Sequence, residues 1–398
     1  MDRMKYLVFA IIILCANNTT SQTIYANLPL EREILLPPQG FGIELLNSKG
    51  NSGIFNNVSN IGKINPASIY HLQNLSIGFS YQFQSSIDSA WFAGTGTSRV
   101  QNFLPQSFGA ILHYDNLSFG IGFGQKYNGS VDFDPIPITT VTEPDGTGEY
   151  FYPEFENSLQ SYTFSTAYQF KEIIFENSNL SFGLKYLLNR LSSYESIGNV
   201  SASASAFGSN FEIGACFEIK TNTQQIINIG ISYTSGTGIR GGVEYEGTRT
   251  LIPGSVPGDS LRYQIISQPY NLSLEVPSEL SFDIFFNLNK KIGLSGRINN
   301  KFWEDVSDNS NNQLELSTNT VYSFTPSTNA SLGLFYTNKS YAEDYFNINA
   351  ELYAFYITAG VSFRISFINL DLAVADSHLF SGDRLKQTIG KIGLGIQL

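Results

Sequence analysis

The chain has 398 residues, of which 42% are apolar and only 14% are charged, and its formal net charge is −11. This composition, with 31 phenylalanines and 22 tyrosines, excludes a disordered chain. The acidic balance argues against nucleic acid as a partner, because phosphate binding needs a basic patch.

Residues 1–21 have the layout of a secretory signal peptide. Arg3 and Lys5 form a basic start, residues 6–16 form an apolar run too short to span a bilayer, and small residues precede Gln22. We therefore expect export and cleavage near residue 21. Cys216 is then the only cysteine left, so we expect no intrachain disulfide.

Residues 22–72 differ from the rest of the chain. They show no alternation of apolar and polar residues, and prolines and glycines interrupt them repeatedly. We interpret this stretch as a compact N-terminal segment that does not form strands.

From residue 73 to the end, short segments carry an apolar residue at every second position. In the first of them, Leu75, Ile77 and Phe79 alternate with small or polar residues. This period is typical of strands with one apolar and one polar face. Similar segments lie at 108–114, 117–123, 162–170, 180–188, 211–219, 227–233, 280–288, 292–298, 314–324, 330–336, 352–364, 370–374 and 392–398. The count predicts about fourteen strands, and an even number puts both ends of a barrel on one side.

The connections between these segments alternate in length. Short polar turns fall at 115–116, 176–179, 222–225, 289–290 and 326–329, and long loops are expected at 129–157, 237–270 and 303–312. Short turns on one side and long loops on the other are typical of outer-membrane barrels. We therefore predict an all-β fold, a transmembrane antiparallel β-barrel over 73–398. A soluble β-sandwich or β-solenoid is the alternative, since alternation alone does not say which face is wet.

The sequence offers little for catalysis or metal binding. None of the three histidines stands near a second histidine or a cysteine at ligand spacing. Adjacent strand residues point to opposite faces, so Asp376, Ser377 and His378 cannot together form a catalytic triad. We predict no enzyme activity, no catalytic residue, no cofactor and no metal site.

Three short motifs resemble one membrane-protein family. Asn65-Pro66-Ala67 stands just before the first strand, residues 276–280 read Val-Pro-Ser-Glu-Leu, and residues 299–303 end on a tryptophan. Together they resemble the FadL-like family of outer-membrane transporters of long-chain fatty acids and hydrophobic compounds. The resemblance implies that residues 22–72 form a plug, or hatch, inside the barrel lumen.

The resemblance also implies a function. Members of the family take up hydrophobic molecules passively: the ligand binds among the outer loops, moves into a pocket beside the plug and leaves sideways through a gap in the wall. The expected partners are hydrophobic small molecules, outer-membrane lipid and the barrel-assembly machinery. This machinery usually uses a terminal aromatic residue, where this chain has Leu398. The alternative function is that of FadL-related barrels that act as protein-secretion (type IX) or assembly partners.

Candidate ligand contacts are apolar residues where polar ones are expected. They are Phe285 and Phe335 on the inner face, and Phe133, Ile136, Ile138, Phe151, Tyr152 and Phe155 in the first long loop. Arg297 and Lys185 point into the lumen by alternation and could hold a carboxylate head group. The alternative is that they pair with Asp283, Glu212 or Glu218 across the interior.

Overall fold

The structure is a computed structural model. It describes residues 45–49, 58–72, 74–89, 97–132, 136–137, 148, 150–151, 154–173, 176–197, 200–221, 225–251, 261–264, 270–306, 308, 310–338, 340, 342, 353–382 and 386–398. The predicted signal peptide and residues 22–44 lie outside this set. Within these ranges no helix has the length and apolar character needed to cross a bilayer.

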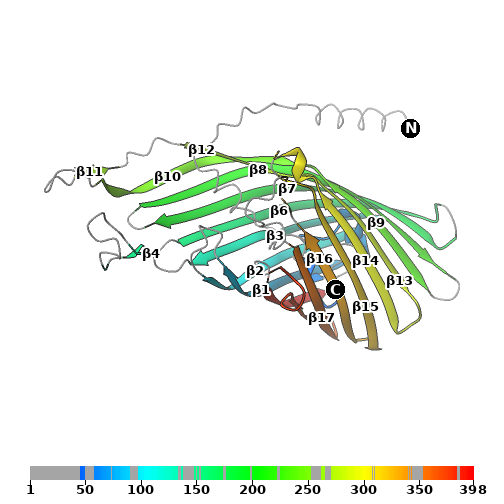
Figure 1. Cartoon of the computed structure of the whole chain (residues 1–398). Coiled ribbons are helices and arrows are strands. Elements are labelled where there is room, and N and C mark those ends of the chain that lie inside the picture. The colour runs from blue at the N-terminus through cyan, green and yellow to red at the C-terminus, as the bar shows by residue number, and fades with distance from the viewer. Residues whose placement is uncertain are drawn as a thin grey trace, which may run out of the picture.

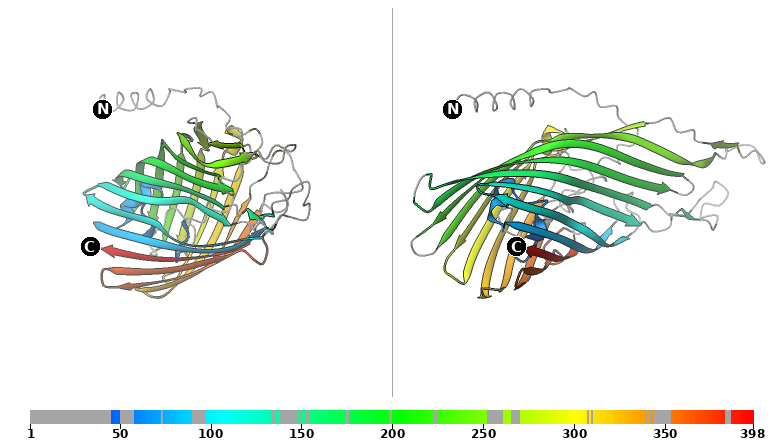
Figure 2. Two further views of the ribbon diagram at one scale, coloured as in Figure 1. Left: turned by 90° about the vertical axis from the view of Figure 1, so that its left-hand side faces the viewer. Right: turned by 180° about the vertical axis from the view of Figure 1, so that it is seen from behind.

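The described strands form a closed antiparallel β-barrel (Figures 1 and 2). The first, β1 (Leu75–Ser89), pairs with both β2 (Thr97–Tyr114) and the last strand, β19 (Gln387–Gln397), so the sheet closes on itself. Between β2 and β19 the wall continues through β3 (Leu117–Asp132), β6 (Glu154–Lys171), β7 (Ser178–Ile197), β8 (Val200–Lys220), β9 (Ile226–Thr234), β10 (Thr237–Leu251), β12 (Tyr270–Val276), β13 (Glu279–Asn287), β14 (Ile292–Lys301), β15 (Gln313–Thr325), β16 (Thr328–Asn338), β17 (Tyr353–Ile365) and β18 (Ile368–Asp376).

Two neighbouring strands of the wall are interrupted at the same height. β9 and β10 are separated by Ser235 and Gly236, and β12 and β13 by Pro277 and Ser278. On the short-turn side of the break β9 pairs with β13, and on the long-loop side β10 pairs with β12. Pro277 has no N–H to give to the ladder, which explains a break there. Counted as continuous, these pieces give the fourteen barrel strands predicted from the sequence.

Smaller elements complete the fold. Outside the wall, β11 (Leu261–Gln264) extends the edge of β10, and β4 (Ile136–Pro137) pairs with β5 (Tyr150–Phe151). Short 3-10 helices lie at Val58–Asn60 (η3), Pro66–His71 (η4) and Trp303–Asp305 (η5).

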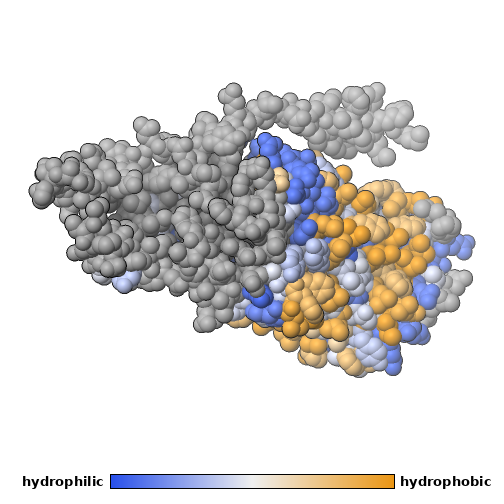
Figure 3. Space-filling view, viewed as in Figure 1, coloured by the Kyte–Doolittle hydropathy of each residue, from blue (hydrophilic) through white to orange (hydrophobic). Residues whose placement is uncertain are grey.

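The barrel exterior carries the apolar side chains that the alternation placed there. On β6 the outward residues Tyr162, Phe164, Tyr168 and Phe170 are each at least 40% exposed, whereas Thr163 and Ser165 between them are buried. Figure 3 shows such residues gathered in a broad band on the barrel exterior. A water-soluble barrel would not expose an apolar band of this size, so the band fits the hydrocarbon of a bilayer.

Several strands are longer than a membrane requires. A transmembrane strand needs about 9–11 residues, whereas β7 has 20 and β8 has 21. On β7 the outward series ends its apolar run at Leu188 and continues with the exposed polar residues Arg190 and Ser192. These strands therefore continue past the apolar band on the side away from the short turns.

The predicted loop at 237–270 is wrong for much of its length. Residues 237–251 form β10, which pairs with residues 200–207 of β8. These segments lie past the apolar band, so their outer faces do not need the alternating apolar residues by which strands are recognised. For the same reason the strand at 200–210 gave no sequence signal, whereas on β2 the irregularity at Gln106 breaks the alternation between residues 103 and 108. The loop at 129–157 is shorter than predicted, because β3 reaches Asp132 and β6 begins at Glu154.

Candidate functional site

Residues 58–72, which we call the lumen segment, lie inside the barrel and are hydrogen-bonded to several strands of its wall. Lys185 of β7 donates from Nζ to the carbonyl of Ile64 (2.6 Å), and Lys63 donates to the carbonyl of Gln125 on β3 (2.5 Å). On the same side of the barrel, Lys391 of β19 contacts the side chain of Asn60.

A preceding turn is held in the same way. The backbone N–H of Ser48 donates to both carboxylate oxygens of Asp371 on β18, at 3.0 and 3.2 Å. Because these bonds reach β3, β7, β18 and β19, the segment is held against the wall along the arc from β18 to β7. That residues 22–72 as a whole form one plug domain stays a prediction, since residues 22–44 are outside the described ranges.

The Asn-Pro-Ala motif is the start of η4, and each residue has a structural role. Asn65 caps the helix by accepting from the N–H of Ala67 at 2.9 Å, and its amide donates to the carbonyl of Ile231 on β9 at 3.1 Å. Pro66 occupies a first-turn position, where its missing N–H costs nothing. Ala67 is fully buried and packs against Cys216 of β8. The motif therefore joins the helix to the wall.

Glycines allow this close approach. A Cβ added to Gly183 would lie 2.3 Å from both the N of Ala67 and the carbonyl carbon of Pro66, and one added to Gly214 would lie 2.0 Å from Oδ1 of Asn65. Both glycines face the lumen, on β7 and β8. A side chain at either position would push η4 away from the wall.

The hydrogen-bonded ladder of the barrel is interrupted between β2 and β3, and we call this interruption the wall gap. β2 and β3 pair from Tyr114 and Leu117 up to Ser107 and Gly124, and there the ladder between them ends. Both strands are irregular at this point: Gln106 is skipped in the pairing of β2 with β1, and Lys126 in the pairing of β3 with β6. Over the described residues 97–106 and 125–132 the two strands have no pairing with each other.

The edge of this wall gap is closed by side chains. The carbonyl of Gln125, which has no strand partner on the β2 side, accepts from Lys63 of the lumen segment and from Gln106 (3.4 Å). Gly124 leaves room for the Lys63 stem, since a Cβ there would lie 3.0 Å from Lys63 Cγ. Lys63 therefore lies at the lumen side of the gap.

A polar cavity of about 60 Å³ lies in the lumen beside Lys63. Its charged lining consists of Lys63, Lys126, Lys185, Arg297, Glu212 and Glu279. Lys185 is bound to Glu212 at 2.7 Å, as one of the sequence alternatives proposed. Four cations and two carboxylates leave a formal excess of two positive charges. Such a lining suits an anionic group.

Arg297 reaches this cavity from β14. It lies directly across the ladder from Asp283 and donates to Ser281 Oγ at 3.0 Å. Glu279 lies within electrostatic reach of Lys126, Lys301 and Arg297. Alternation identified Arg297 in the sequence but not Lys63 or Lys126. Lys63 belongs to the lumen segment, which has no alternation, and Lys126 lies at the irregularity of β3, where the alternation breaks.

Apolar side chains line the lumen on the loop side of this cavity. One cluster is contributed by seven buried residues from β3, β6, β7, β8, β10, β12 and η5, namely Tyr127, Leu159, Leu191, Ala206, Ile239, Val276 and Trp303. Sequence reasoning missed it, although Leu159 and Leu191 are inward positions that break the polar-inside rule. A second cluster contains Phe335, which packs on Tyr356 with ring centroids 5.8 Å apart.

The structure separates the predicted ligand contacts. Phe335 is buried on the inner face, and Phe285 packs in part against the Ala67–Cys216 contact. Phe133, Ile138 and Tyr152 lie outside the described residues, and for Ile136, Phe151 and Phe155 only the backbone is described. The inner-face and loop candidates are therefore not brought into one described site.

The remaining polar candidates have structural roles. His378 Nδ1 lies 3.0 Å from Asp376 Oδ2, but Ser377 is buried and bonds the backbone of Gln387, so the three do not converge. The described ranges contain no group of three His, Cys, Asp or Glu that could hold a metal ion. At the turn end of the lumen, His71 Nδ1 lies 3.5 Å from Glu218 Oε2. Burial lowers the pKa of His71, and the charge of Glu218 opposes this effect.

No family profile and no curated protein matches the sequence. Solved structures are similar in fold. The toluene transporter TbuX of Ralstonia pickettii superposes with a TM-score of 0.60 at 12% identity, covering 91% of this chain and 99% of that one. A Pseudomonas aeruginosa FadL homologue gives 0.58 at 13% identity, with 91% and 98% covered.

The Pseudomonas putida toluene transporter TodX gives a TM-score of 0.57 at 13% identity, covering 91% of this chain and 98% of its own. The three agree over nearly the whole of each chain. The resemblance predicted from the sequence is thus confirmed at the level of fold: the chain is a barrel of the FadL type.

Proposed function

We propose that this FadL-type barrel is a bacterial outer-membrane channel for the passive uptake of hydrophobic compounds such as long-chain fatty acids. The observation that carries the proposal is the wall gap between β2 and β3, with residues 58–72 held against the inner wall beside it. A solute that leaves such a barrel sideways enters the bilayer, and only a hydrophobic solute gains free energy there, roughly 25 cal/mol for each Å² removed from water.

Two further features support this path. The apolar cluster around Leu159 and Leu191 lines the lumen on the loop side, where a ligand arriving from outside first meets the barrel. The cavity with Lys126 and Arg297 follows, next to Lys63 at the wall gap. Apolar contacts followed by a cationic cavity suit an amphiphile with an acidic head group. Toluene, which TbuX and TodX carry, has no such group.

Stapling the wall gap tests the path. Gln106→Cys and Gln125→Cys place one thiol on each side of it, in a Cys15→Ser background, for joining by a short thiol-to-thiol linker. The control joins Asn329→Cys to Ser362→Cys, which are directly paired on β16 and β17. Uptake of a radiolabelled long-chain fatty acid by cells should fall with the first linker only. Equal uptake in both variants would exclude exit between β2 and β3.

Arg297→Ala tests the head-group role. We expect slower uptake of a fatty acid but unchanged uptake of an uncharged hydrocarbon, with normal barrel assembly. If both substrates are affected equally, Arg297 serves the structure of the lumen.

A deletion strain distinguishes this uptake function from the alternative role as a protein-secretion or assembly partner. If the chain is a secretion partner, the deletion strain loses cargo proteins from the cell surface and keeps its fatty-acid uptake.

A further inference from the structure

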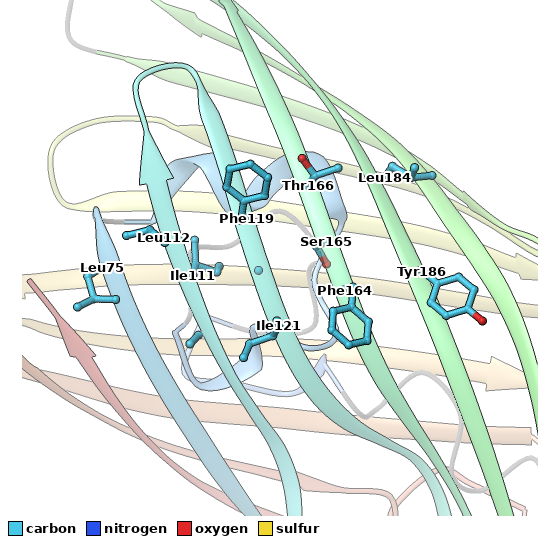
Figure 4. A pocket seen from close by; sticks show the side chains of 12 residues that line it. Leu75, Ile111, Leu112, Phe119, Ile121, Phe164, Ser165, Thr166, Leu184 and Tyr186 are labelled. Carbon is cyan, nitrogen blue, oxygen red and sulfur yellow. The ribbon is translucent and has the colours of Figure 1, made fainter. Parts of the chain in front are cut away.

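The exterior of the wall has a groove of its own, separate from the lumen. It has a volume of about 500 Å³ and spans β1 to β7 on the face that carries the apolar band. Figure 4 shows Phe119, Ile121 and Phe164 standing on the near side of the wall, with the opposite side of the barrel behind them. The lining comes from β1, β2, β3, β6 and β7.

Two small outward residues make the groove. Across the strands one row reads Ala110, Ile121, Phe164 and Tyr186, and the next row reads Leu112, Phe119, Thr166 and Leu184. In each row a small residue, Ala110 or Thr166, stands beside large neighbours that are 43% to 59% exposed. The large side chains therefore form the rims, and the backbone of the wall forms the floor.

The groove does not lead into the lumen. Ile111 and Ser165 beneath it turn their side chains inward and are buried, Ile111 in the cluster that includes Ile61 and Ile64 of the lumen segment. The groove lies on the turn side of the barrel, because Leu112 and Phe119 are close to the turn at residues 115–116. It is therefore open only to the bilayer, in the leaflet next to the short turns.

The lining selects a hydrocarbon. It contains no charged residue, and the polar groups that face outward are the hydroxyls of Thr166 and Tyr186. The volume falls within the range of sites that enclose a small ligand, roughly 300–1,000 Å³. Water in this groove would find few hydrogen-bond partners, whereas lipid acyl chains surround the barrel at this depth of the bilayer.

We propose that this groove binds one acyl chain of a membrane phospholipid and holds it longer than the surrounding lipid does. Lipid tails are as apolar as the protein surface, so the preference comes from contact and not from the hydrophobic effect. A chain in the groove touches side chains on both sides and backbone below, while a chain on the flat wall has one contact surface. The binding needs the barrel to lie in a bilayer, and it is independent of what the lumen transports.

Filling the groove tests the proposal without disturbing the fold. Ala110→Phe and Thr166→Phe put apolar side chains where apolar outward neighbours already stand. Ala330→Phe on β16 is the matched control, because Ala330 lies in an outward row beside Tyr322 and Val361. Full-length protein is purified from membranes, incubated with phosphatidylethanolamine vesicles, extracted in mild detergent and weighed by native mass spectrometry. Resistance to unfolding by cold SDS verifies the barrel.

We expect the wild type and Ala330→Phe to retain a bound phospholipid, and the doubly filled variant to retain about fivefold less. Where the double variant fails to assemble, Ala110→Phe alone is compared with the control. Equal retention in all three proteins would overturn the proposal. So would a wild type that carries detergent only and no phospholipid.

Discussion

A methyl group on Gly183 should undock the lumen segment while leaving the barrel intact. In Gly183→Ala the new Cβ would lie 2.3 Å from the backbone of Pro66 and Ala67. Carbon contacts begin at about 3.5 Å, so the two elements must separate by about 1.2 Å. The atoms it meets are backbone, which cannot rotate away. The ladder of β7 is unaffected, because its bonds to β6 and β8 are made by the main chain.

The expected cost follows from known overpacking. Inserting a methyl group into a packed site costs about 1–3 kcal/mol. This cost acts on the docking of η4 against the wall, since the barrel can keep its ladder. The undocked fraction should therefore rise by about 5- to 160-fold, taking RT as about 0.59 kcal/mol.

Cys216 reports this change directly. Its thiol is 3% exposed and packs on Ala67 of η4, so it can react with a water-soluble maleimide only when η4 moves. In a Cys15→Ser background it is the sole cysteine. We expect Gly183→Ala to label faster by that same factor. The control is Gly390→Ala, whose Cβ would have its nearest neighbour in Phe83, 4.0 Å away.

The result that would refute this reasoning is a folded Gly183→Ala barrel whose Cys216 labels as slowly as in the control. In that case the lumen segment would shift without exposing the wall, or would not be held by this contact. Failure to resist cold SDS would show that the ladder itself was damaged, and Gly214→Ala on the next strand would then be used.

Three further outcomes are expected. Lys185→Met leaves Glu212 buried without its 2.7 Å partner, which should lower barrel stability by about 3–5 kcal/mol in urea titrations, and Glu212→Leu in the same chain should restore part of it. Burial lowers the pKa of His71, so undocked His71 binds a proton near its ordinary pKa of about 6.5, whereas docked His71 binds one only at a lower pH. Docking should thus be full above that pH and weaken below it, seen as faster Cys216 labelling relative to SDS-unfolded protein, and His71→Gln should remove the dependence. Lys63→Met removes the donor at the wall gap, so cells should take up a radiolabelled long-chain fatty acid faster than with wild-type protein, and equal uptake would show that Lys63 does not close the gap.

Much of the barrel was predictable from the sequence because strand orientation is a local property. Residues two apart share a face, so the outward series Tyr162 to Phe170 could be assigned without knowing its neighbours. Prediction failed where that rule has no force. Past the apolar band the outer face of β10 no longer needs apolar residues, while its inner face contributes the buried Ile239, so the alternation is lost and the sequence predicts a loop where a strand forms.

The site depended on contacts between distant residues. That Lys185 binds both Glu212 and the carbonyl of Ile64 joins positions up to 121 residues apart, and the end of the β2–β3 ladder depends on irregular pairing with strands on both sides. No local pattern encodes such distances. The sequence by itself therefore determined which side chains face outward and how many strands form. Only the tertiary structure decided where the wall is open, what lies against the gap and which small residues leave a groove on the exterior, because each requires several strands to be placed side by side.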